Sequence, residues 1–263
     1  MVPSLDATPP IGAGTEAPTS TTPADPRSSP HDADTAVELY WLPLGAGGVV
    51  VRFCGRMYER LRALIERRRP RDLYHCALEV VVPEGHFTIE LTPVQDAGGA
   101  SRGVSREGPV GSRWLGRFRL FRYELRCWRD GVIPDAVWAV AGPERLTQDP
   151  QDAHRLLSLV ASVPTPVWGR DELRTGEMWN SNSVIAWLIA RSEISGAEPR
   201  PPAGGRAPGW HAGVVVARRQ QHGRWVAPRS TAVGRPVPAP SWQAPVTPGM
   251  APRAGMARQE RAS

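Results

Sequence analysis

The strongest constraint on the fold is a pair of alternating apolar segments separated by a short turn. Residues 74–82 read YHCALEVVV and residues 86–92 read HFTIELT, with Pro-Glu-Gly between them. β-Branched residues in a period-two pattern around a proline and a glycine predict an antiparallel β-hairpin. A third strand is predicted at about 121–128, where the sequence reads FRYELRCW. These segments predict a small antiparallel sheet.

A strand, a helix and further extended chain are predicted before the hairpin. Residues 37–44 and 48–53 are short apolar runs bounded by glycine, which favour strands. A helix follows, because apolar residues recur at helical spacing and then stop at the arginine-rich segment 67–71. These arginines suit the carbonyl end of a helix and Pro70 blocks its extension, although anion binding is the alternative. The apolar residues of this helix are Met57, Tyr58, Leu61, Leu64 and Ile65.

The chain after residue 148 is predicted to be mainly helical. Asp149 and Pro150 form a helix-start signal, with Asp152 as an acidic residue in the first turn. Residues 179–191 read WNSNSVIAWLIAR, and their apolar residues have helical spacing in a segment apolar enough to be buried. Residues 212–218 read AGVVVAR and predict a last strand. The glycine-rich excursion near 98–113 lacks the spacing of a phosphate-binding loop.

These elements predict one α+β domain over residues 36–219 with a disordered tail at each end. Residues 1–35 have few large apolar side chains and carry a net charge of −4, from one arginine against five acids. Residues 220–263 are proline-rich and carry +5, from six arginines against one glutamate. The tails are either solvated ends or regions that attract each other or hold separate partners.

Composition limits which cellular compartment and which cofactors we expect for this protein. The longest apolar runs fall short of the roughly 18 residues that a membrane span needs, so we expect a cytoplasmic protein. All 32 basic residues are arginine, which indicates a biased base composition more than a nucleic-acid partner. Cys54, Cys76 and Cys127 form no CxxC pair, so neither a disulfide framework nor a metal site is expected. No fingerprint of an organic cofactor occurs.

The only two asparagines in the chain flank one serine at the start of the buried helix. Asn180, Ser181, Asn182 and Ser183 form a run of four polar residues, whereas one polar residue is enough to cap a helix. The positive end of a helix also stabilises an oxyanion and favours an ionised nucleophile. The run is therefore either a cap or the place where Ser181 acts as a nucleophile.

A serine nucleophile needs a base, and the hairpin offers one. His75 lies on the first strand of the hairpin, and Glu90 lies on the second. A carboxylate on a neighbouring strand can hold an imidazole in the correct tautomer, as in triads of nucleophile, histidine and acid. We expect His75 to be the base and Glu90 to orient it, with structural roles for both as the alternative.

The order of these features along the chain resembles that of a known family. The features are a strand histidine, an acid on the next strand, a long insertion and an Asn-X-Asn-Ser helix start. They resemble the circularly permuted papain-like proteins related to NlpC/P60 peptidases and lecithin:retinol acyltransferase, over residues 70–190. In that family the residue between the asparagines is commonly a cysteine, and here it is Ser181. The resemblance implies a permuted papain-like fold with Ser181, His75 and Glu90 as catalytic residues.

The resemblance implies a hydrolase or acyltransferase that acts on an amide, ester or thioester of a small molecule, lipid or peptide. Asn180, Asn182 and Trp179 are then the candidate substrate-binding residues. A serine hydroxyl ionises much less readily than a thiol, so a non-catalytic binding module of the same fold is the second hypothesis. A third is nucleic-acid association through the basic C-terminal tail, with Trp225 and Trp242 available to stack on bases.

Overall fold

The protein is described by a computed structural model over residues 35–45, 59–94, 103–194, 196 and 199–223. The predicted strand at 48–53, the residues Met57 and Tyr58, and nearly all of both predicted tails lie outside the described residues. The elements that follow therefore belong to the central part of the chain.

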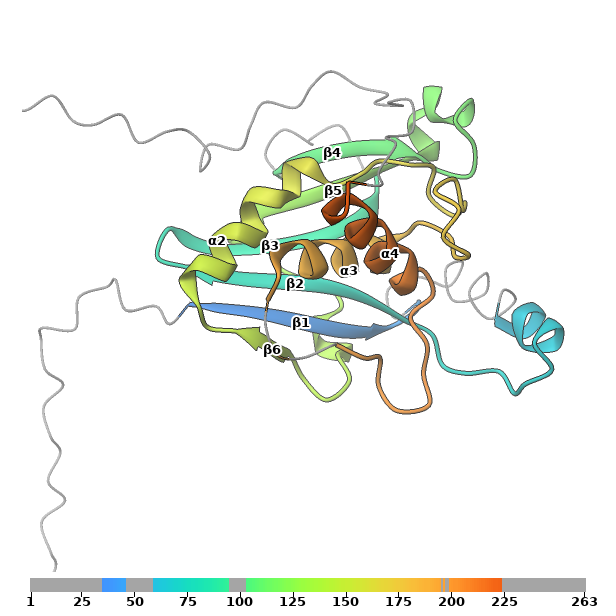
Figure 1. Cartoon of the computed structure of the whole chain (residues 1–263), viewed down its shortest axis with the longest axis horizontal. Helices are drawn as coiled ribbons and strands as arrows, with labels where there is room; N and C mark the ends of the chain where they lie inside the picture. Colours follow the sequence, from blue (N-terminus) through green and yellow to red (C-terminus); the bar gives the residue numbers. More distant parts are fainter. Residues whose placement is uncertain (1–34, 46–58, 95–102, 195, 197–198, 224–263) are drawn as a thin grey trace, which may run out of the picture. The chain divides into compact units, whose positions relative to one another are not determined.

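Six strands form one sheet in the order β4-β5-β3-β2-β1-β6, and neighbouring strands are antiparallel (Figure 1). An α+β fold with an antiparallel sheet is therefore confirmed at this level. The strands are β1 (Ala36–Pro43), β2 (Tyr74–Val82), β3 (Gly85–Pro93), β4 (Val104–Pro109), β5 (Arg122–Arg129) and β6 (Glu144–Thr147).

The predicted hairpin is formed by β2 and β3. Val82 pairs with Gly85, which leaves Pro83 and Glu84 as the turn, and Leu78 pairs with Ile89. The predicted third strand is β5, which pairs with β3. The glycine-rich segment was expected to be an irregular excursion, but its described end forms β4 and pairs with β5. The sheet is therefore wider than the sequence predicted.

Three helices pack on the sheet or on one another: α2 (Pro150–Leu159), α3 (Ser181–Ser192) and α4 (Trp210–Gln221). Figure 1 shows them on one side of the sheet, with α3 crossing its middle strands. The predicted start of α2 is confirmed, since the Asp149 side chain accepts a hydrogen bond from the Gln151 backbone nitrogen at 2.7 Å. No helix in the described part of the chain is long and apolar enough to cross a membrane.

The segment 212–218 was predicted to be a strand and is instead the centre of α4. Its β-branched valines favour a strand locally, but packing against α3 overrides that preference. A Cβ atom on Gly213 would lie 2.1 Å from the Ser183 carbonyl oxygen, so only glycine permits this close approach. The helix ends at Gln221, two residues inside the span predicted as the C-terminal tail.

Residues 59–65 are helical, as predicted, but their large apolar side chains are not buried by the described residues. Leu61, Leu64 and Ile65 are 59%, 75% and 64% exposed. The segment after the helix has a structural role, because Arg68 forms ion pairs with Glu59 and Glu66. Ion pairs therefore connect this helix to the segment that follows it, and the predicted apolar face is exposed.

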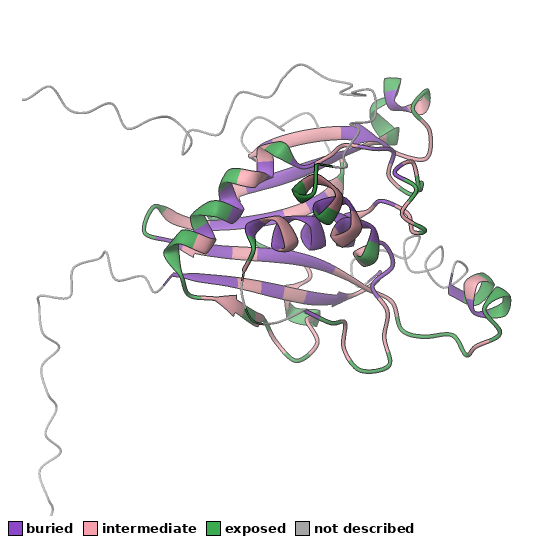
Figure 2. Ribbon diagram, in the orientation of Figure 1, coloured by how far each residue is buried: buried purple, intermediate pink, exposed green. Residues whose placement is uncertain are grey.

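Alternating residues of the central strands separate the interior into two layers. Leu39, Leu78 and Ile89 face the helices and pack in the main core with residues such as Ile185 of α3. On the other face, Leu42 and Ala77 pack with Ile133 of the segment that follows β5. Figure 2 shows the central strands and α3 as the most continuously buried elements. The orientation of a strand residue therefore decides which layer it joins.

Candidate functional site

The polar run at the start of α3 forms a network of hydrogen bonds to the backbone. Asn180 caps the helix by accepting from the Ser183 backbone nitrogen at 3.2 Å, and its Nδ2 donates to the Pro208 carbonyl at 2.8 Å. The Ser183 hydroxyl donates to the Gly209 carbonyl at 2.8 Å. Asn180 and Ser183 therefore fix the start of α3 to the segment that leads into α4.

Asn182 connects the same helix to the sheet. Its Nδ2 donates to the carbonyls of Tyr74 and Pro208, both at 2.9 Å. Its Oδ1 accepts from the Cys76 thiol, with a sulfur–oxygen distance of 3.2 Å. Burial raises the pKa of Cys76 well above its usual range, so this thiol stays protonated and serves as a donor. The side-chain amide of Asn182 is thus fully used in structural hydrogen bonds.

Ser181 is the exception in this run. It occupies the first position of α3, is 9% exposed, and its hydroxyl has no hydrogen-bond partner among the described residues. His75 does not approach it from the sheet. Since Cys76 faces α3, the preceding residue His75 faces the opposite layer. The expected contact between Ser181 and His75 is not formed, and this is a correction to the predicted triad.

His75 and Glu90 lie on the same face of the sheet, and both are close enough to Asp135 to be influenced by its charge. Burial lowers the pKa of His75, and the charge of Asp135 opposes this only partly. Burial raises the pKa of Glu90, with Glu124 and Asp135 acting in the same direction and Arg126 against it. The imidazole is therefore kept neutral, and no hydrogen bond joins it to Glu90.

Glu90 is paired with an arginine rather than with the imidazole. The guanidinium of Arg126 donates to Glu90 Oε1 at 3.3 Å and to Glu124 Oε1 at 2.6 Å. Arg126 and Glu124 are 5% and 2% exposed, so this is a buried ion-pair cluster. The Arg126 side chain links Glu90 of β3 to β5, so Glu90 is engaged with a cation and is not free to orient the imidazole.

Trp179 was expected to contact a substrate, but it is part of the core. Its side chain is 1% exposed and belongs to the main apolar cluster. Its Nε1 is buried without a hydrogen-bond partner in the described part of the chain. The backbone of Trp179 pairs with Gly169 and Arg170, which fixes the segment before α3. Trp179 therefore supports α3 from inside the protein.

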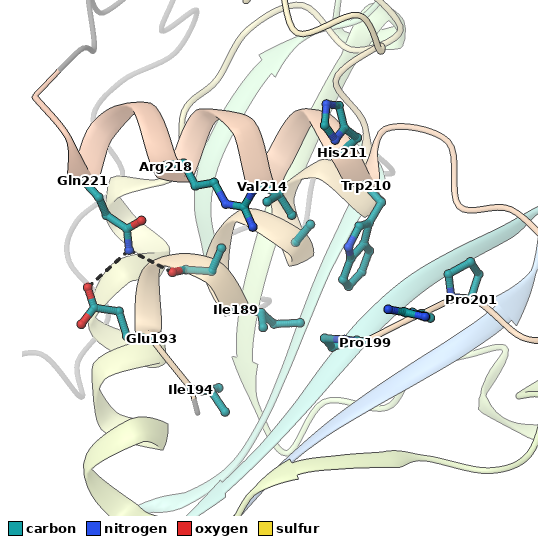
Figure 3. A pocket seen from close by; sticks show the side chains of 13 residues that line it. Ile189, Glu193, Ile194, Pro199, Pro201, Trp210, His211, Val214, Arg218 and Gln221 are labelled. Carbon is teal, nitrogen blue, oxygen red and sulfur yellow. Dashed lines mark hydrogen bonds between the residues drawn. The ribbon is translucent and has the colours of Figure 1, made fainter. Parts of the chain in front are cut away.

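A pocket of about 600 Å³ lies beside α3 and α4, closed on a further side by the segment 199–201 (Figure 3). Trp210 forms one wall, where its ring lies 5.0 Å from that of Trp41 on β1. The larger apolar side chains that line the pocket are Ile189, Ile194, Pro199, Pro201, Trp210 and Val214. The walls are thus mainly aliphatic and aromatic.

Three charged side chains line the same pocket, Glu193, Arg200 and Arg218, and their environments differ. Gln221 donates from Nε2 to Glu193 Oε1 at 3.3 Å and to the Ala190 carbonyl at 3.2 Å, which closes one end of the pocket (Figure 3). The guanidinium of Arg218 extends toward the pocket and has no ion pair or hydrogen bond to any described residue. Arg218 is therefore a charged group available to a ligand.

Sequence reasoning missed this pocket because it treated residues 212–218 as a strand. One sequence feature could have indicated a helix here. The end of that segment is a polar run typical of an exposed helix end, Arg218, Arg219, Gln220 and Gln221. Among the residues with described positions, no group of three or more His, Cys, Asp or Glu side chains could hold a metal ion. The papain-like resemblance rests on its short motifs alone, because comparison with protein-family models, curated proteins and solved structures finds no match.

Proposed function

We propose that this protein is a non-catalytic binding module for a small amphipathic anion, held in the pocket beside α3 and α4. The observation that carries the proposal is the Arg218 guanidinium, a cation without a partner among the described residues, beside an apolar-walled pocket. A binding module is the second hypothesis that the sequence raised, with its ligand now at a different site.

The size and lining of the pocket support a small organic ligand. Its volume of about 600 Å³ lies within the range of roughly 300–1,000 Å³ that is typical of small-molecule sites. Ile189, Val214 and Trp210 offer apolar contact surface to a hydrocarbon chain or ring. Burial of such a group supplies most of the binding free energy in this type of site.

The charges support an anionic head group on that ligand. Glu193 already accepts a hydrogen bond from Gln221, whereas Arg218 has no counter-charge in the described residues. A guanidinium binds a carboxylate or phosphate through parallel hydrogen bonds. Because Arg218 is exposed, screening by water reduces its contribution to about 1 kcal/mol, or roughly fivefold in affinity.

Acyl chemistry at Ser181 has less support. A serine hydroxyl needs a base within hydrogen-bond reach, and His75 faces the other layer of the sheet. Asn180 and Asn182, the candidate substrate ligands, are engaged with backbone carbonyls. Neither residue is therefore free to orient a substrate.

The proposal is tested by titrating the full chain with decanoate and with its neutral counterpart decanol, using isothermal titration calorimetry. We expect decanoate to bind about fivefold more tightly than decanol, because only decanoate engages Arg218. Arg218→Gln should remove this preference while it leaves the affinity for decanol unchanged. Val214→Trp, which fills the pocket, should weaken both ligands.

Arg60→Gln is the matched control, because it removes an exposed arginine of the helical residues 59–65, outside the pocket lining. It should bind both ligands as the unaltered protein does. The proposal is wrong if Arg218→Gln keeps the preference for decanoate, or if Val214→Trp folds normally and binds both ligands with undiminished affinity.

A further inference from the structure

The segment between β4 and β5 has an unusual combination of charge and apolar surface. Residues 112–122 read SRWLGRFRLFR, with four arginines, no acidic residue and five large apolar side chains. We call these residues the arginine–aromatic segment. Three of its four arginines share two acidic neighbours, since Arg113 pairs with Glu172, Arg122 lies 3.8 Å from Glu107, and the charge of Arg119 also acts on Glu107. The segment therefore retains a positive charge of its own.

Four of its five large apolar side chains are exposed, and Leu115 is half-buried. Trp114, Phe118 and Leu120 are 61%, 49% and 82% exposed, and Phe121 is 37% exposed. Figure 1 shows the segment projecting from the sheet beside β4, and Figure 2 shows that most of it is exposed. Large contiguous apolar surface is uncommon on a monomer and indicates a contact with another apolar phase or molecule.

The segment is held in a defined conformation. It contains two 3₁₀ turns, η2 (Leu115–Arg117) and η3 (Arg119–Phe121). The Arg122 Nε donates to the Gly116 carbonyl at 2.6 Å. The Trp114 and Phe118 rings meet edge to face with centroids 5.8 Å apart. The exposed side chains are thus positioned before any partner arrives, which lowers the entropic cost of binding.

The details favour a lipid bilayer over a nucleic acid. The Arg117 guanidinium lies 3.7 Å from the centre of the Trp114 ring and so occupies one ring face that a base would use for stacking. The most exposed apolar residue is Leu120, which has no aromatic face. Tryptophan, phenylalanine, leucine and arginine together are instead the side chains that enter the interface of an anionic bilayer.

We infer that the arginine–aromatic segment docks the protein peripherally on anionic membranes. Phe118 and Leu120 enter the boundary between head groups and acyl chains, while Arg117 and Arg119 lie among the anionic lipid head groups. The positive charge of the segment complements the anionic surface, and its exposed apolar side chains leave water on contact. This surface is separate from the ligand pocket and does not depend on the function proposed for it.

The test measures flotation of the full chain with vesicles of phosphatidylcholine alone and of phosphatidylcholine mixed with phosphatidylglycerol. We expect stronger binding to the mixed vesicles. The double variant Phe118→Ser with Leu120→Ser should weaken that binding by about tenfold or more, because two apolar side chains no longer insert. Arg117→Gln with Arg119→Gln should remove the preference for the anionic lipid and reduce the sensitivity to salt.

Val137→Ser with Trp138→Ser is the matched control, because it removes two side chains that are 81% and 61% exposed in another part of the chain. It should float as the unaltered protein does, and circular dichroism should show that every variant is folded. Three results overturn the inference: no flotation, equal loss in the control, or unchanged binding of Phe118→Ser with Leu120→Ser. The last result would assign membrane binding to other basic residues of the chain.

Two further results would assign the segment to another partner. Binding of a single-stranded oligonucleotide that is lost in the Phe118→Ser, Leu120→Ser variant, without flotation of the unaltered protein, would indicate a nucleic-acid surface. Self-association lost in the same variant, measured by light scattering without lipid, would indicate a contact between copies of the chain. Either result contradicts membrane docking.

Discussion

The two faces of β2 are stabilised in different ways, although the residues that define them are neighbours in sequence. Cys76 faces the helices, where its thiol meets Asn182 of α3. His75 faces the other layer, near a core of Leu42, Ala77 and Ile133 and within the electrostatic influence of Asp135. The helix face depends on apolar packing and one polar anchor, whereas the other face contains buried charges. Neighbouring polar residues on one strand can therefore lie in two different environments, one mainly apolar and the other containing buried charges.

The largest expected effect comes from breaking the charge cluster on the face without the helices. Arg126→Met leaves Glu90 and Glu124 buried without their cation, and should lower the free energy of unfolding by about 3 kcal/mol at neutral pH. The loss should shrink on acidification, as the carboxylates become protonated. Urea unfolding at several pH values measures this.

Arg129→Met is the control for that experiment. Arg129 lies at the end of the same strand, but its ion pair with Asp130 is long, at 3.9 Å, and exposed. We expect a change of less than about 0.5 kcal/mol for this variant. Equal losses for Arg126→Met and Arg129→Met would mean that burial does not distinguish the two arginines.

The contact between the helices and β2 is tested at Asn182, the polar residue of α3 that bonds to this strand. Asn182→Leu leaves the carbonyls of Tyr74 and Pro208 without this donor and removes the acceptor of the Cys76 thiol. The expected loss is about 2 kcal/mol in the free energy of unfolding. Denaturant titration followed by tryptophan fluorescence measures it. A loss no larger than that of Ser181→Ala would refute the anchoring role.

A smaller effect concerns the pH dependence of stability through His75. Burial lowers the pKa of His75 in the folded state, so below its ordinary value of 6.5 the unfolded chain binds a proton more readily than the folded one. His75 therefore makes the folded state less stable as the pH falls through that region. In His75→Gln this part of the acid sensitivity should disappear, measured by urea unfolding at pH values of about 7.5 and 5.5.

His154 provides a control of opposite sign. Burial acts to lower the pKa of His154, but hydrogen bonds to Glu84 and to the Pro150 carbonyl outweigh burial and raise this pKa. Protonation of His154 then stabilises the folded state as the pH falls, so His154→Gln should increase the acid sensitivity. The same change in both variants would contradict the assignment for His75.

The smallest effect is expected at Ser181. Its hydroxyl makes no hydrogen bond to a described residue, so Ser181→Ala should change the free energy of unfolding by less than about 0.5 kcal/mol. Binding of decanoate should also be unchanged. An acyl-ester hydrolysis by the unaltered protein that is lost in Ser181→Ala would instead revive the catalytic hypothesis and require another base.

The sequence predicted individual helices and strands better than the way in which they pack against one another. Period-two alternation identified β2 and β3, and the Asp149–Pro150 signal identified the start of α2, because both depend on local preferences. Which face α3 covers depends on packing between segments a hundred residues apart, such as Cys76 and Asn182. Local patterns do not contain that information.

The same limit applies to the candidate sites. Asn180 and Asn182 were correctly singled out as unusual, but their partners are backbone carbonyls of Tyr74 and Pro208, which a side-chain pattern does not reveal. The pocket requires α3, α4 and the segment 199–201 together. The valines of α4 favoured a strand, whereas the segment is a helix that packs against α3, where Gly213 allows a close approach to Ser183.

The two outer strands of the sheet, β6 and β4, affect how readily copies of the chain aggregate. β6 has only four residues and pairs with β1 through a register shift, and β4 pairs with β5 through another between Val104 and Arg106. Long, regular outer strands recruit strands from other molecules and begin fibrils, whereas short or bulged ones offer a poor template. Both borders of the sheet thus discourage edge-to-edge aggregation of this chain.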